Sequence, residues 1–363
     1  MPVTYIVTGA AGFIGSNFVR LALDREDVRI VVLDKLTYAG NQANLAGLRD
    51  NPDFEFVKGD ITDGALVRRL LETFRPSAIL NFAAETHVDR SIDSPACFLE
   101  TNVTGTFTLL ESARDYFSGG EAPGNFRFLQ VSTDEVYGSL GNTGYFTEDT
   151  PYSPNSPYSA SKAAADHFSG AYFSTYGLPV LITNCSNNYG PFQFPEKLIP
   201  LMILKALDAQ PLPIYGDGSN IRDWIYVEDH CSGVLEVLKR GIPGEKYNLG
   251  GNCEKSNVEV VDAVCGVLES LSPASENPAM IKHGLGTYMD LKSYVKDRPG
   301  HDQRYAIDAS RVRKELGWVP GHEFSKGLRK TVQWYLDNLD WCRDIQSGEY
   351  RMERLGLIGD KNR

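Results

Sequence analysis

The residues from Tyr5 to Gly15 read YIVTGAAGFIG, and they set the architecture of the chain. An apolar, β-branched run leads into three glycines, and a helical pattern follows from Ser16 to Leu23. This order predicts a strand, a tight turn and a helix. Free N–H groups and the positive end of the helix dipole favour a pyrophosphate at such a turn, and glycines let it approach the backbone. The spacing G-x-x-G-x-x-G departs from the usual G-x-G-x-x-G, and glycines also serve turns that bind nothing.

The next strand-like run supports a dinucleotide site, because Arg29–Leu33 ends at Asp34. A carboxylate at about this distance from the glycines binds a ribose 2′-hydroxyl and would repel a 2′-phosphate, so the sequence favours NAD over NADP. Asp60 follows a third run at Phe54–Val57. It could accept a hydrogen bond from the adenine amine or cap a helix.

Length, charge and cysteine usage exclude several classes of protein. With 363 residues and 42% hydrophobic content, the chain can bury a large core. A net charge of −11 argues against nucleic acid and anionic membranes as partners, although a small anionic substrate needs only a few cations. The six cysteines show neither CxxC pairs nor zinc spacing, so we expect free buried thiols and no metal. With no signal-like or membrane-spanning segment in the sequence, we expect a cytoplasmic protein.

Short apolar runs alternate with amphipathic stretches over the first half of the chain. This alternation predicts an α/β fold, a Rossmann-type doubly wound parallel sheet with helices on both faces. The expected strands lie near Tyr5, Ile30, Phe54, Ile79, Phe128 and Leu181, and the expected helices near Phe18, Val67, Phe107 and Ala164.

A change in texture after residue 186 predicts a smaller C-terminal lobe. Prolines break the chain into short elements from Pro191 to Pro213. We therefore expect an NAD-binding domain over 1–186, to which later segments return, a substrate-binding lobe mainly over 187–340, and a polar tail over 341–363. Helical patterns recur over 228–239, 258–271, 310–316 and 325–338.

Two polar motifs carry the expected chemistry. Thr133-Asp134-Glu135 follows the strand at 128–132, at the edge of the sheet where this fold binds ligands. Adjacent carboxyls in different environments can serve as acid and base for eliminating water. The competing interpretation is a helix N-cap followed by a solvated turn.

Tyr158 and Lys162 are four residues apart, so on a helix they share one face. A nearby ammonium would lower the pKa of the tyrosine and make it a base for a sugar hydroxyl. An isolated YxxxK pair is more often an idle surface pair, but downstream of a nucleotide turn we favour the catalytic interpretation.

At this point the chain resembles the extended short-chain dehydrogenase/reductase family and, more closely, the dTDP-glucose 4,6-dehydratases. The resemblance covers residues 1 to about 340. The Thr133-Asp134-Glu135 triplet discriminates most, because related epimerases usually carry no acid pair there. The motifs that carry the resemblance are Gly9–Gly15, Asp34–Asn41, Ala83–Ser91, Thr133–Glu135, Tyr158–Lys162, Asn187–Pro191 and Asp297–Asp302.

The resemblance implies NAD-dependent dehydration of a nucleoside diphosphate hexose, most simply dTDP-glucose, to a 4-keto-6-deoxy sugar. Tyr158, assisted by Lys162, would deprotonate the C4 hydroxyl, and Thr133 would hydrogen-bond the C4 oxygen. Glu135 would remove the C5 proton and Asp134 would protonate the departing C6 hydroxyl. NAD would be regenerated in each turnover and stay bound.

The same resemblance implies the binding residues. The cofactor set is Gly9, Gly12, Phe13, Ile14, Gly15, Asp34, Lys35, Leu36, Thr37, Asp60, Ile61, Ala83, Ala84, Thr86, Thr101, Tyr158, Lys162 and Asn188. The substrate set is Thr86, Thr133, Asn187, Lys197, Leu198, Pro213, Tyr215, Arg222, Asn257, Arg298 and His301. Arg222 and Arg298 would clamp the diphosphate. Without the family, an ion pair of Arg222 with Asp223 or of Lys197 with Glu196 explains either residue equally well.

Several alternatives remain open from the sequence. UDP-glucose and CDP-glucose are possible substrates, a sugar-nucleotide 4-epimerase is the runner-up activity, and a silent NAD-binding protein is a third class. We expect His87 to be structural and the aromatics Trp334, Tyr335 and Trp341 to be packing residues. The resemblance also implies a homodimer through a four-helix interface formed by Cys97–Phe117 and Pro157–Tyr176.

Overall fold

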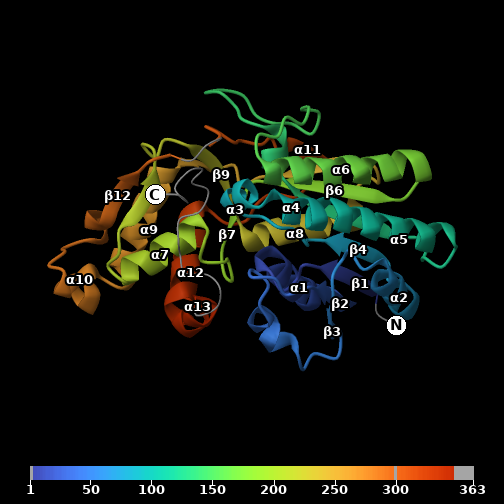
Figure 1. Cartoon of the computed structure of the whole chain (residues 1–363), viewed down its shortest axis with the longest axis horizontal. Helices are drawn as coiled ribbons and strands as arrows, with labels where there is room; N and C mark the ends of the chain where they lie inside the picture. Colours follow the sequence, from blue (N-terminus) through green and yellow to red (C-terminus); the bar gives the residue numbers. More distant parts are fainter. Residues whose placement is uncertain (1–2, 298–300, 347–363) are drawn as a thin grey trace.

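The computed structural model describes residues 3–297 and 301–346 (Figure 1). Its largest element is a parallel sheet of seven strands in the order β10-β6-β5-β4-β1-β2-β3. The order reverses between β1 and β4, as in a doubly wound nucleotide-binding sheet. The strands are β1 Val3–Thr8, β2 Val28–Asp34, β3 Phe54–Lys58, β4 Ala78–Asn81, β5 Arg127–Thr133, β6 Val180–Cys185 and β10 Lys246–Leu249.

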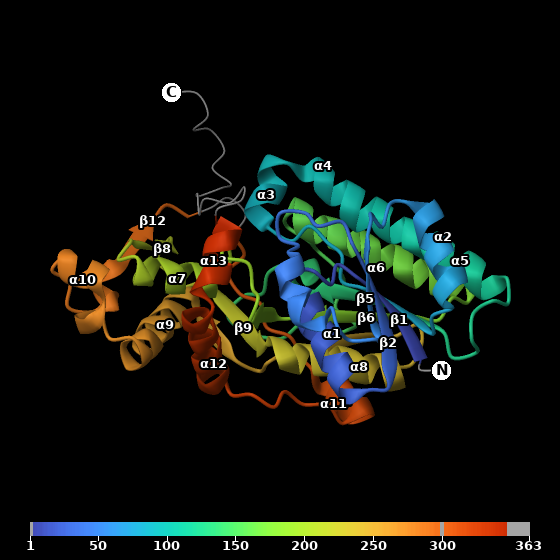
Figure 2. The ribbon, with the colours of Figure 1, turned by 90° about the horizontal axis from the view of Figure 1, so that it is seen from below.

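Helices cover both faces of this sheet (Figure 2). One face packs on α1, α8 and α11 through residues such as Val7 and Val32, and the other packs on α2, α5 and α6 through Ile6 and Val31. Alternate residues of one strand thus enter opposite cores, which explains the continuous apolar runs. The helices are α1 Phe13–Arg25, α2 Gly64–Phe74, α5 Thr106–Ser118, α6 Pro157–Tyr176, α8 Val227–Arg240 and α11 Ser310–Leu316.

A second core lies beside the sheet, around α7, α9 and α12 (Figure 1). Two small sheets, β11-β9-β7 and β12-β8, accompany it. The helices here are α7 Leu198–Leu207, α9 Asn257–Leu271, α10 Pro278–Lys282, α12 Phe324–Asp337 and α13 Leu339–Gln346. The strands are β7 Asn187–Tyr189, β8 Leu212–Tyr215, β9 Ile221–Tyr226, β11 Glu254–Ser256 and β12 Lys292–Val295.

Short helical elements make up the connections. They are η1 Gln42–Leu48, α3 Val88–Asp93, α4 Pro95–Phe98, η2 Leu99–Gly105, η3 Asp134–Tyr137, η4 Ala274–Glu276 and η5 Tyr288–Leu291.

The structure confirms the fold class, the six expected strands and the expected helices. The seventh strand, β10, escaped prediction because its four residues KYNL alternate polar and apolar and are too few to stand out. The division at residue 187 stays a prediction. Residues 347–363, most of the expected polar tail, lie outside the described residues, whereas Trp341 and Cys342 pack in α13.

The six cysteines are free thiols, as expected, although Cys97 is exposed and Cys253 is half-buried. Within the described residues, no helix has the length and apolar character needed to cross a membrane.

Candidate active site

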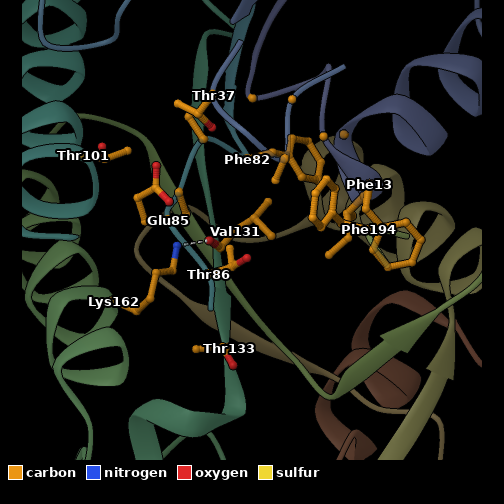
Figure 3. Close-up of a pocket in the computed structure, with 18 of the residues that line it drawn as sticks. Phe13, Thr37, Phe82, Glu85, Thr86, Thr101, Val131, Thr133, Lys162 and Phe194 are labelled. Carbon is orange, nitrogen blue, oxygen red and sulfur yellow. Dashed lines mark hydrogen bonds between the residues drawn. The ribbon is translucent and has the colours of Figure 1, made fainter. Parts of the chain in front are cut away.

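A cavity of about 280 Å³ lies at the carboxyl ends of β1, β2, β4 and β5, where the strand order reverses (Figure 3). This is the edge at which doubly wound sheets bind their ligands. The cavity brings together the expected cofactor residues, with Leu36 as the exception, and all five expected catalytic residues. Four expected substrate residues also line it: Thr86, Thr133, Asn187 and Lys197.

The glycine-rich turn is shaped so that side chains cannot replace its glycines. Gly9 has φ +68°, and a Cβ there would lie 2.5 Å from the Cα of Ala83. A Cβ on Gly15 would lie 2.7 Å from the carbonyl oxygen of Gly9. The turn therefore packs tightly on β4 and leaves its backbone open at the start of α1, which fits a dinucleotide diphosphate.

Asp34 is buried at the end of β2, where its carboxylate accepts hydrogen bonds from the backbone N–H groups of Ala11 and Leu36, both at 2.8 Å. It therefore ties the glycine-rich turn to the second strand. Burial raises the pKa of this carboxyl, and the two backbone donors oppose the rise.

Asp60 pairs with Lys35 at 2.7 Å beside the same cavity. The helix-cap interpretation of Asp60 is wrong, because α2 begins at Gly64 and Asp63 caps it, accepting from the N–H of Leu66. Lys35 lowers the pKa of Asp60 against the effect of burial.

The two acids of the Thr133-Asp134-Glu135 motif lie in different environments. Asp134 is 1% exposed, and its Oδ2 has no hydrogen-bond partner among the described residues. Burial, and after it the charges of Glu135 and Asp223, hold the pKa of Asp134 well above its usual range. Glu135 is only partly buried.

The local helix η3 is capped by Thr133, whose Oγ1 accepts from the N–H of Glu135 at 3.3 Å. The competing interpretation is therefore right that this segment contains a helix N-cap, which is Thr133. It is wrong that the turn is solvated at Asp134, because that side chain is buried. A protonated buried carboxyl next to a more accessible one can act as an acid beside a base.

Tyr158 and Lys162 project from α6 into the cavity and are 7% and 4% exposed, so the surface-pair interpretation is wrong. The Nζ of Lys162 donates to the carbonyl oxygen of Val131 at 2.7 Å (Figure 3). Burial, and after it Glu135, raises the pKa of Tyr158, and a hydrogen bond with Thr133 opposes the rise.

The raised pKa of Tyr158 is opposite to the lowering that we expected from a nearby Lys162. The reason is that the phenol has lost its water, while the ammonium bonds a backbone carbonyl and is itself desolvated, which lowers the pKa of Lys162.

Lys197 reaches from the end of the 193–197 loop to the expected substrate residue Thr86, with its Nζ 2.9 Å from the Thr86 carbonyl oxygen. Its neighbour Glu196 instead accepts from Tyr38 at 3.0 Å and lies 3.4 Å from Nε of Arg90. Glu196 and Lys197, which both line the cavity, thus connect different segments of the chain to its wall.

Arg222 is buried in β9 and donates to the carbonyl oxygens of Ile221 at 2.7 Å and Asp302 at 2.9 Å. The surface ion pair with Asp223 is therefore wrong, and Asp223 accepts from the N–H groups of Gly251 and Cys253 instead.

His301 bonds Asp297 at 2.7 Å, and its ring lies 6.2 Å from that of Tyr215. Arg298 lies outside the described residues. The other expected substrate residues lie in elements of or beside the second core: Leu198 at the start of α7, Pro213 in β8 and Asn257 at the start of α9. Among the described residues, the expected substrate residues that do not line the cavity are Leu198, Pro213, Tyr215, Arg222, Asn257 and His301.

Sequence reasoning missed several residues of the cavity wall. Ser132 directly precedes the acid triplet, and Glu85 lies inside the motif Ala83–Ser91. Both could therefore have been predicted from their position in the sequence. Phe194 and Glu196 come from a loop without periodicity, and no sequence signal placed them there. The additional lining residues are Leu33, Ala39, Gly40, Gly59, Phe82, Glu85, Val131, Ser132, Cys185, Ser186, Gln193, Phe194 and Glu196.

The residues expected to be structural are so. Nδ1 of His87 accepts from the N–H of Arg90 and caps α3. Trp334, Tyr335 and Trp341 form an aromatic cluster, and Nε1 of Trp341 donates to Asn44 at 2.9 Å.

Known proteins resemble the chain along most of its length. The model of a family described as GDP-mannose 4,6 dehydratase matches residues 6–331. A dTDP-glucose 4,6-dehydratase of Xanthomonas campestris pv. campestris is 57% identical over 355 residues, which cover 97% of this chain and 99% of that protein. The dTDP-glucose 4,6-dehydratase of Neisseria meningitidis serogroup B is 54% identical over 97% of this chain and 98% of its own.

Solved structures agree with these relatives. A crystal structure of dTDP-glucose 4,6-dehydratase from Bacillus anthracis in complex with NAD has a TM-score of 0.83 and 47% identity, and it covers 94% of this chain and 99% of its own. DesIV, a dTDP-glucose 4,6-dehydratase from Streptomyces venezuelae with NAD and TYD bound, has a TM-score of 0.84 and 46% identity, with coverages of 94% and 100%. A UDP-glucose 4-epimerase from Thermotoga maritima has a TM-score of 0.80 at 25% identity, with coverages of 93% and 100%.

Proposed function

Because the chain belongs to the 4,6-dehydratase family within the extended short-chain dehydrogenases/reductases, we propose that it converts dTDP-glucose to dTDP-4-keto-6-deoxyglucose and water. The observation that carries this proposal is the pair Asp134 and Glu135, a deeply buried carboxyl beside an accessible one, in the same cavity as Tyr158. The elimination of water uses one carboxyl as the acid and the other as the base, whereas a 4-epimerase needs neither of these two carboxyls.

The cofactor is NAD, which close structural relatives hold and whose diphosphate fits the glycine-rich turn at the start of α1, where the N-cap residue Gly12 has no capping side chain. When bound, it supplies the acceptor for hydride from C4 of the sugar and the donor that returns this hydride to C6. Asp34, buried beside the glycine turn, binds the adenosine ribose, and Asp60 lies at the adenine end. The reaction regenerates the oxidised form of NAD in each turnover, so the cofactor need not be exchanged and stays bound.

Tyr158 begins the reaction by accepting the proton of the C4 hydroxyl. Because burial raises the pKa of its phenol, ionisation requires positive charge nearby, and Lys162 on the same helix face supplies it. Thr133, already hydrogen-bonded to the phenol, positions the C4 oxygen. The resulting 4-ketone acidifies the proton on C5.

Glu135 and Asp134 then divide the elimination. Glu135 accepts the C5 proton, because it is the more accessible carboxylate. Asp134 donates its proton to the departing C6 hydroxyl, because burial keeps this carboxyl protonated. Water leaves, a 5,6-alkene forms next to the ketone, and reduction at C6 with protonation at C5 completes the 6-deoxy sugar.

The nucleotide part of the substrate is bound by the lobe over 187–340. Lys197 and Asn187 face the sugar and diphosphate from the cavity wall, and Arg222 supplies a guanidinium next to the Asp302 segment. Tyr215 and His301, whose rings meet, lie where the base and ribose extend from the diphosphate. UDP-glucose and CDP-glucose are the competing substrates, and the relatives at 54–57% identity favour dTDP-glucose.

The functional unit is a homodimer held by η2, α5 and α6, with a four-helix interface at its centre. Support comes from apolar side chains left exposed on these helices: Leu99 is 59% exposed, Tyr176 50%, and Phe107 and Phe168 41% each. The helices α5 and α6 lie side by side (Figure 1), and the rings of Phe107 and Phe168 on them lie 6.0 Å apart, so the two exposed side chains form one apolar patch. The six free thiols fit a reducing compartment, and we place the enzyme in the cytoplasm.

Mass spectrometry of the sugar nucleotide tests this proposal. Purified protein is incubated separately with dTDP-, UDP- and CDP-glucose, and Glu135→Gln serves as the inactive control. We expect loss of one water from dTDP-glucose. If the protein converts UDP-glucose or CDP-glucose but not dTDP-glucose, that sugar nucleotide is the substrate. Isomerisation of the sugar without loss of mass would overturn the dehydratase function.

A further inference from the structure

A buried carboxylate behind the active site, Asp166, is not used by the mechanism above. It follows Tyr158 and Lys162 at the same spacing of four residues, so the three side chains share one face of α6. Asp166 is 2% exposed, and its Oδ1 has no hydrogen-bond partner among the described residues. A carboxylate held away from water is costly unless its hydrogen bonds offset the lost hydration.

The other oxygen of Asp166 gathers three donors from three separate segments. The hydroxyl of Ser132 donates to Oδ2 at 2.6 Å and that of Tyr152 at 3.0 Å, while Nδ2 of Asn184 lies 3.4 Å away. Nδ2 of Asn184 also lies 3.2 Å from the carbonyl oxygen of Thr133. The carboxylate therefore joins α6 to β5, β6 and the loop that follows η3.

This contact falls at the residue before the acid triplet. Lys162 holds Val131, and Asp166 holds Ser132, so two successive residues of β5 are bonded to the face of α6 that carries Tyr158. Thr133, Asp134 and Glu135 continue directly from this anchored strand end. The distance between the acid pair and the tyrosine is therefore fixed by the two anchors.

We infer that Asp166 is a positioning residue of the dehydratase, which fixes the Ser132–Thr133 end of β5 against α6 and so aligns the acid pair with Tyr158. The inference rests on the proposed function. It assigns Asp166 no contact with substrate, and its effect on the reaction passes through Ser132, Asn184 and Lys162.

The charge of Asp166 adds to this effect. It opposes the burial that lowers the pKa of Lys162, so a neutral residue at 166 would leave the ammonium less stable. Its own pKa is raised by burial, with Lys162 acting against the rise. The titratable groups that surround the pair from other elements are Tyr152, Tyr137, Cys185 and Lys246.

The test compares Asp166→Asn with wild-type holoenzyme, using dTDP-glucose as substrate. Asparagine keeps the shape but loses the charge, and only one of its two terminal atoms accepts hydrogen bonds. We expect kcat to fall by about 100-fold, the cost of a misplacement of about 1 Å, while KM and bound NAD per subunit stay within about two-fold. The alkaline limb of the pH profile should move to lower pH, because Lys162 loses its proton more easily.

Two controls separate positioning from stability. Asp229→Asn removes another buried carboxylate, one that bonds the backbone N–H and Nδ1 of His322, both at 2.9 Å, far from the triplet in the chain. It should lower the melting temperature without changing kcat. Ser132→Ala should lower kcat in wild type but have little further effect in Asp166→Asn, because the two residues form one contact.

An Asp166→Asn enzyme with kcat within about two-fold of wild type, or one whose lower activity follows its loss of NAD, would reduce Asp166 to a stabilising residue. Additive effects of Ser132→Ala and Asp166→Asn on kcat would also contradict the inference. Wild-type protein that leaves dTDP-glucose unchanged would overturn the proposed function itself, a result distinct from both.

Discussion

The ammonium of Lys162 lies 2.7 Å from the carbonyl oxygen of Val131, two residues before Thr133. One hydrogen bond thus connects the helix that carries Tyr158 with the strand that ends in the acid triplet. Lys162 is buried, so its charge acts in a poorly solvated site where Coulomb interactions are strong.

Replacing Lys162 by methionine should therefore lower kcat by about 10²- to 10⁴-fold, the usual range for losing proton-transfer catalysis. Lys162→Arg should also be impaired, because the planar guanidinium does not fit the space of a compact ammonium. Steady-state kinetics at several pH values measure this effect. Methionine at 162 with kcat within about ten-fold of wild type would argue against the role of the ammonium.

The variant Glu135→Gln should keep NAD and still oxidise C4, yet fail to eliminate water. The amide retains the shape of the side chain but cannot accept the C5 proton. Rapid-mixing absorbance should show reduced nicotinamide that builds up, and mass spectrometry should show no 6-deoxy product. Normal product from this variant would exclude Glu135 as the base.

Asp134→Asn should slow the loss of the C6 oxygen by about 10²-fold or more, because the departing hydroxyl loses its acid. Its reduced nicotinamide should also accumulate, so solvent-deuterium exchange at C5 distinguishes the two variants. Exchange should continue in Asp134→Asn, where Glu135 still acts, and should stop in Glu135→Gln.

The burial of Asp134 should also make the free energy of unfolding depend on pH. The folded pKa of Asp134 is raised, so its contribution to stability is complete below the unfolded pKa of about 3.9 and is lost as pH rises towards the folded value. Relative to Asp134→Asn, wild type should lose up to about 1.4 kcal/mol of unfolding free energy per pH unit over that window. Urea unfolding of both proteins between about pH 4 and pH 7 measures the difference. A difference that is constant with pH would contradict the raised pKa.

Most of the fold could be predicted from the sequence, because the strands of the large sheet are buried on both faces and read as apolar runs. The cofactor-binding turn could also be predicted, because Gly9 and Gly15 occupy positions where a Cβ does not fit and glycine is therefore required. The buried state of Asp134 and the direction of the pKa of Tyr158 could not be predicted. Both depend on which distant segments exclude water, among them β9 with Arg222 and Asp223, and spacing along the chain carries no such information.

The exposed surface on α5 and α6 predicts dimer dissociation in Phe107→Asp, because a charge would be buried against apolar side chains. The dissociation constant should rise by at least about ten-fold, which corresponds to about 1.4 kcal/mol. Light scattering over a range of concentrations measures it, and Ile281→Asp on α10, 58% exposed in wild type, is the matched control. A Phe107→Asp protein that stays as dimeric as the control would place the interface elsewhere.

The most direct measurement follows a deuterium label from C4 of dTDP-glucose. Since the hydride removed from C4 returns to C6, the product should have lost one water and should carry the deuterium in its C6 methyl group, as mass spectrometry and NMR can locate. Product in which the label stays at C4 with inverted configuration, or is lost to solvent, would contradict dehydration by internal hydride return.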